Sequence, residues 1–71
     1  MLTIKKVIEE AIKVRKAEID FLRAQEKMIA QSPVYFPDKH LLILADIENF
    51  ESQIAELKQS LQIIYDANNN K

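Results

Sequence analysis

The chain has 71 residues and a formal net charge of −1, and it contains neither cysteine nor glycine. The lack of cysteine excludes a disulfide framework and the common cysteine-bearing zinc sites, and the lack of glycine excludes a glycine-rich phosphate-binding loop. The near-neutral charge argues against general nucleic-acid binding, which depends on neutralising phosphates. We expect one small domain over residues 1–71 that needs self-association or a partner for stability.

The first predicted helix covers residues 3–31. Thr3 is a suitable N-cap, and Pro33 disfavours helical backbone at Ser32, so the helix should end near Gln31. Apolar residues at heptad spacing along one side predict a face that packs on a second helix. We give the name intramolecular seam to the apolar residues at this spacing on both predicted helices. The first helix contributes Ile8, Ile12, Ile19, Leu22 and Ile29. Arg15 and Glu26 occupy the two remaining heptad positions, and Arg15 is a candidate for setting the register.

A second apolar face lies beside this seam on the same helix. We call it the docking ridge, and it consists of Ile4, Val7, Ala11, Val14, Phe21 and Met28. Glu18 and Gln25 interrupt it and are expected to lie at its rim. Both faces together cover about 200° of the helix, whereas packing on one neighbour needs about 100°. The pattern therefore predicts a second neighbour for this helix, which is either another copy, giving a homodimeric four-helix bundle, or a different protein.

The connection is expected over residues 32–38, where Pro33 and Pro37 interrupt the helical pattern. Pro37 suits the first turn of a new helix. Tyr35 and Phe36 are expected to fold back over the open end of the hairpin and to cover Ile29 and Ile43 there. The alternative is that they form an exposed aromatic contact for a partner.

The second predicted helix covers residues 39–66. Its apolar residues are spaced 4-3-4-3-4-3, and the outward positions between them are nearly all polar. This half of the intramolecular seam consists of Ile43, Ile47, Phe50, Ile54, Leu57, Leu61 and Ile64. Residues 67–71 are predicted to fray as a polar tail. The fold class predicted is all-α, an antiparallel two-helix hairpin, with dimerisation to a four-helix bundle as an option.

Catalysis, cofactors and metals are not expected. His40 is the only histidine, and its spacing from Asp38 and Asp46 does not bring the three side chains to one helical face. We expect His40 to face solvent at the start of the second helix. Charges recur at every helical turn near the amino end, so we expect neither a secretory segment nor a membrane span, and we expect a cytoplasmic protein that contacts no membrane.

The second arm carries the residues of a family resemblance: Leu41-Leu42, Ile47-Glu48, Ile54 and Leu61-Gln62-Ile63-Ile64-Tyr65. On a hairpin of this length, they resemble the YscE/EscE-type small co-chaperones of bacterial type III secretion. The resemblance implies a protein that pairs with a larger chaperone built of helical repeats, and the pair keeps the needle subunit soluble before export. The docking ridge is then the expected surface for that chaperone.

Two other functions remain open. Needle subunits are also short helical hairpins with a proline-containing turn, so the chain could be a structural subunit of a filament. The other alternative is a small homodimeric regulatory protein, with contact to nucleic acid through Lys5, Lys6, Lys13 and Lys16.

Overall fold

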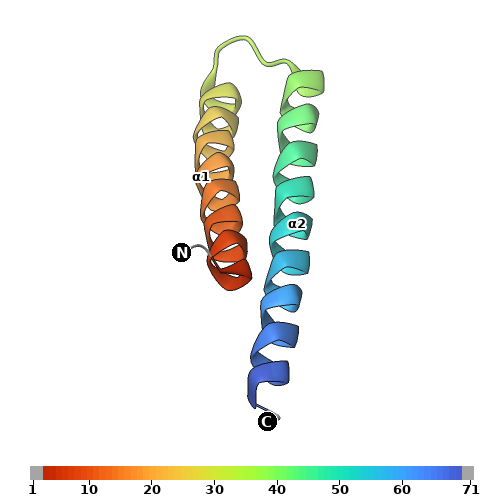
Figure 1. Cartoon of the computed structure of the whole chain (residues 1–71). Helices are drawn as coiled ribbons and strands as arrows, with labels where there is room; N and C mark the ends of the chain where they lie inside the picture. The colour runs from red at the N-terminus through yellow and green to blue at the C-terminus, as the bar shows by residue number, and fades with distance from the viewer. Residues whose placement is uncertain (1–2, 70–71) are drawn as a thin grey trace.

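The computed structural model describes residues 3–69, which form two helices joined by a short connection (Figure 1). Helix α1 spans Ile4–Gln31 and helix α2 spans Pro37–Asn69. The helices run antiparallel, with the connection at one end of the molecule, and the last turns of α2 extend beyond the start of α1 at the other end. The molecule measures 59 × 21 × 12 Å. The prediction of an all-α, antiparallel two-helix hairpin is confirmed.

The helix ends follow the local chemistry of the sequence. The Thr3 side-chain oxygen accepts a hydrogen bond from the backbone N–H of Lys6 at 3.2 Å, which confirms Thr3 as the N-cap of α1. At the other end, the backbone N–H of Ser32 donates to the carbonyl of Ile29. Helix α2 begins at Pro37, where the missing N–H of proline has no cost. No described residue has a positive φ, so the chain reverses direction without needing glycine.

Helix α2 continues farther than the sequence pattern predicts. The expected end near residue 66 and the polar tail from residue 67 are wrong for 67–69, which are helical. The apolar periodicity stops after Ile64, but neither proline nor glycine follows to break the helix. The Gln62 amide also donates to the carboxylate of Asp66 one turn later, at 3.0 Å, which supports the last turns. The predicted tail residues 70–71 lie outside the described residues.

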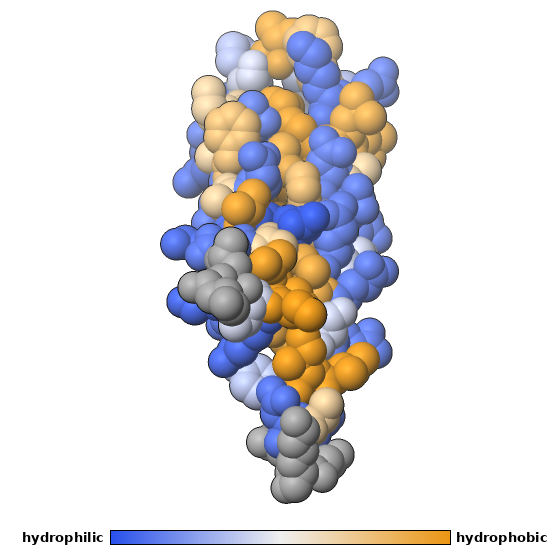
Figure 2. Space-filling view, in the orientation of Figure 1, coloured by the Kyte–Doolittle hydropathy of each residue, from blue (hydrophilic) through white to orange (hydrophobic). Residues whose placement is uncertain are grey.

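The core lies along the boundary between the two helices. Its five buried side chains are Ile12, Ile19, Leu22, Ile47 and Ile54. Half-buried side chains pack against them from both helices: Ile8, Ile43, Phe50, Leu57 and Leu61. All ten belong to the intramolecular seam, and its last two members, Ile29 and Ile64, are half-buried. Figure 2 shows the apolar surface as a stripe that follows the helix boundary.

Two further contacts join the helices outside the core. The ammonium group of Lys5 lies 4.8 Å from the centre of the Tyr65 ring, so the start of α1 contacts the end of α2. Interaction with the Tyr65 hydroxyl raises the pKa of Lys5. Arg23 and Glu51 form an exposed ion pair at 3.6 Å, which contributes little stability.

Candidate protein-binding face

The docking ridge lies on the surface of the hairpin. Its large side chains, those of Ile4, Val7, Val14, Phe21 and Met28, are between 53 and 73% exposed, and Ala11 is half-buried. Helix α2 therefore leaves this side of α1 uncovered. The ridge is centred about 100° around α1 from the seam, given 3.6 residues per turn. An apolar series of this length on a small protein indicates an interaction surface.

The space beside the ridge is shallow. Near the connection, a groove of about 250 Å³ lies between the helices and is lined by Gln25, Met28, Ile29 and Ile43. Its lining is mainly apolar and includes one member of the ridge. Two grooves elsewhere along the helix boundary share Lys16 and Lys58 and carry charged rims. The groove at Met28 is thus the one that continues the apolar character of the ridge.

Arg15 crosses the seam and reaches α2. Its Nε–H donates to the side-chain oxygen of Gln53 at 2.7 Å, and its Nη1–H donates to the carbonyl of Ala11 at 3.1 Å. Both contacts are partly buried. A guanidinium at this heptad position has a defined partner on α2, so sliding one helix along the other would break the contact. The Arg15–Gln53 contact therefore favours the observed register of the two helices, and a register-setting role of Arg15 stays a prediction.

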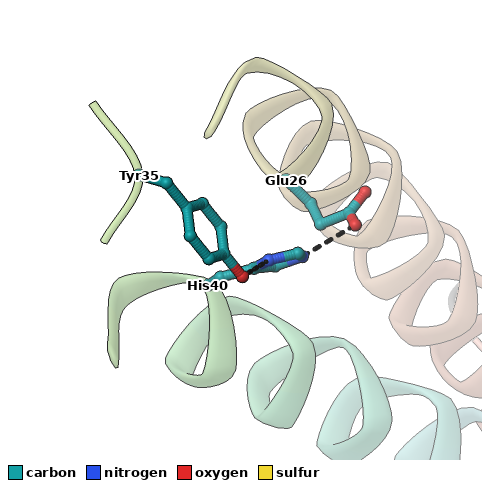
Figure 3. A network of polar contacts seen from close by, with 3 residues as sticks. All are labelled: Glu26, Tyr35 and His40. Atoms are coloured by element: carbon teal, nitrogen blue, oxygen red, sulfur yellow. Dashed lines mark hydrogen bonds and ion pairs between the residues drawn. The ribbon is translucent and has the colours of Figure 1, made fainter. Parts of the chain in front are cut away.

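Glu26, Tyr35 and His40 form a second polar contact between the helices, near the connection (Figure 3). His40 Nε2 lies 2.8 Å from Glu26 Oε1, and the Tyr35 hydroxyl lies 2.7 Å from His40 Nδ1. An ionised carboxylate can only accept, so Nε2–H is the donor; in the neutral ring, Nδ1 then accepts from the Tyr35 hydroxyl. The side chain of His40 is 17% exposed and that of Glu26 is 33% exposed. The prediction that His40 faces solvent is therefore wrong.

The predicted position of Tyr35 and Phe36 over the open end of the hairpin is also wrong. Tyr35 is 51% exposed and Phe36 is 53% exposed, so neither side chain seals the end. The Tyr35 ring meets the His40 ring edge-on, with ring centres 5.6 Å apart, and its hydroxyl finds its partner there. The Lys39 ammonium lies 5.3 Å from the centre of the Phe36 ring. Each of the two aromatic side chains thus contacts a polar residue that follows it closely in the sequence.

The sequence contains a signal for the Glu26–His40 contact. His40 lies three residues before Ile43, so it extends the heptad series of α2 by one position. Glu26 occupies a heptad position of α1 at the same end of an antiparallel hairpin. Taken together, Glu26 and His40 occupy facing heptad positions and can form a polar pair. Taken singly, each looks like an interruption of the apolar series of its helix.

The described residues 3–69 contain no group of three or more histidine, cysteine or acidic residues that could hold a metal ion. No helix within this part of the chain has the length and apolar character needed to cross a membrane. The feature that the described residues do present is an exposed apolar face on α1.

We compared the chain with protein-family models, with curated proteins and with solved structures, and none of the three comparisons gives a match.

Proposed function

We propose that this protein is a non-enzymatic binding module, a cytoplasmic co-chaperone of type III secretion that pairs with a larger helical-repeat chaperone. The pair would keep the needle subunit soluble before export. The observation that carries the proposal is the exposed docking ridge of α1. The resemblance of α2 to YscE/EscE-type proteins supplies the class of partner.

The hairpin is suited to this role because its two faces are separate. The intramolecular seam holds α1 against α2, while the large side chains of the neighbouring ridge on α1 remain exposed. A partner that covers the ridge gains the burial of apolar surface, worth about 25 cal/mol per Å² before the costs of association. The bound hairpin is stabilised by mass action, without any turnover.

The test is co-expression of the chain with tetratricopeptide-type chaperones of type III secretion, followed by size-exclusion chromatography of the complex. Phe21→Asp places a charge on the ridge and is expected to weaken the complex by at least about 30-fold, as loss of a central aromatic contact does. Ile63→Asp is the matched control, because Ile63 is 63% exposed and Phe21 is 60% exposed, but Ile63 belongs to α2.

Both variants should keep the helical circular dichroism of the parent, because neither position is in the core. The proposal is wrong if no repeat chaperone forms a complex, or if Ile63→Asp weakens the complex as much as Phe21→Asp. Growth of filaments as the chain is concentrated would instead favour a structural subunit.

A further inference from the structure

The docking ridge is a complete heptad series once its two polar positions are included. Glu18 and Gln25 extend it so that eight residues from Ile4 to Met28 are spaced 3-4-3-4-3-4-3. The exposed apolar residues of α2 lie toward its two ends instead: Leu41, Leu42, Leu44, Ile63 and Tyr65. Helix α1 therefore presents a continuous face on which one more helix can pack along its whole length, whereas α2 presents no such face.

We propose that this additional helix is α1 of a second copy, running antiparallel about a twofold axis. The register that places Ile4 opposite Met28 of the second copy uses every position of the series. It pairs Val7 with Gln25, Ala11 with Phe21 and Val14 with Glu18. The small Ala11 leaves room for the large Phe21, which is the size alternation that close helix packing requires. Register shifts of one heptad leave residues at the ends without partners.

Charge favours the antiparallel direction. In a parallel pair, Glu18 would face Glu18 of the second copy, and the like charges would repel. In the antiparallel register, each Glu18 instead faces Val14 of the second copy, so the like-charge contact is avoided.

The area fits a dimer that dissociates readily. Helix α1 has 28 residues and is about 42 Å long. If about a third of the circumference of a helix 10–12 Å wide is covered, each copy buries about 500 Å². The total of about 1,000 Å² is at the lower limit for specific interfaces. A dimer of this kind can exchange for another protein on the same ridge.

Cysteine cross-linking tests the register, because the natural chain has no cysteine. Ile4→Cys and Met28→Cys chains, one carrying a mass tag, are mixed at high concentration under mild oxidation. Ile4 and Met28 are 73% and 72% exposed, so the hairpin should tolerate both changes. We expect the mixed disulfide between the two variants in at least about tenfold excess over either self-linked product. A disulfide needs Cα atoms within about 7 Å of each other, whereas identical positions of the two copies lie about 36 Å apart in the antiparallel pair.

Self-linked Ile4→Cys and Met28→Cys products in place of the mixed one would show a parallel pair and overturn the proposal. So would sedimentation of the unmodified chain as a monomer up to about 1 mM, the range of very weak association. The proposal does not rest on the co-chaperone function, since both experiments use this chain alone. A dimer that binds no repeat chaperone would refute that function while supporting this interface.

Discussion

Replacement of Ile47 by alanine should unfold much of the hairpin. Ile47 is 5% exposed and belongs to the five-residue buried core. Truncating a buried isoleucine costs about 2–5 kcal/mol, whereas a domain of this size is stable by about 0.05–0.15 kcal/mol per residue. The cost is thus a large fraction of the whole free energy of unfolding. Because helices in proteins are stabilised mainly by tertiary packing, the loss should appear as reduced helical circular dichroism and an earlier urea transition.

Ile63→Ala is the matched control for this experiment. It makes the same chemical change in the same helix, but Ile63 is 63% exposed. Its effect on the free energy of unfolding should stay within about 0.5 kcal/mol, as for other surface substitutions. Equal shifts of the urea midpoint in the two variants would show that the helix boundary at Ile47 is not the core of the molecule in solution.

The second large effect is expected at the Glu26–His40 contact. Glu26→Ala leaves His40 partly buried without its acceptor, and His40→Ala leaves the carboxylate without its donor. Loss of a partner in a hydrogen bond that involves a charged group costs about 1–3 kcal/mol. The double variant Glu26→Ala/His40→Ala removes both groups, so its cost should be clearly less than the sum of the single costs. Urea unfolding of all four proteins at neutral pH gives this coupling energy.

Arg23 and Glu51 provide the control pair. They also join α1 to α2, but their side chains are 59% and 55% exposed and the contact is longer, at 3.6 Å. A double-mutant cycle on them should give about 0.2–1 kcal/mol of coupling, as exposed pairs do. A coupling at Glu26–His40 no larger than this would mean that the contact is not maintained in solution.

The arrangement of the helices could be predicted because a heptad series has one consistent interpretation. Each seam residue indicates the same side of its helix as the packing face, so an error at one position does not change the predicted face. The core residues Ile12 and Ile54, for example, follow from the spacing alone. The ridge could be predicted as an apolar face for the same reason, and the structure leaves its large side chains exposed.

The contact between Tyr35 and His40 and the course of the connection could not be predicted in this way. Tyr35 contacts His40 through a hydrogen bond between residues five apart, and apolar patterning carries no information about this bond. The end of α2 differs from the prediction for a related reason, because the end of apolar periodicity is not a signal that stops a helix.

The placement of the two polar contacts also suggests the order in which the hairpin folds. Glu26 and His40 are separated by 14 residues, whereas Arg15 and Gln53 are separated by 38. Closing the shorter loop loses less chain entropy, so contacts near the connection should form first and the pairing should then spread toward the termini. The folding nucleus would thus include the glutamate–histidine pair. In stopped-flow refolding, the Glu26→Ala protein should fold more slowly than the parent, while Ile8→Ala, at the far end of the seam, should mainly unfold faster.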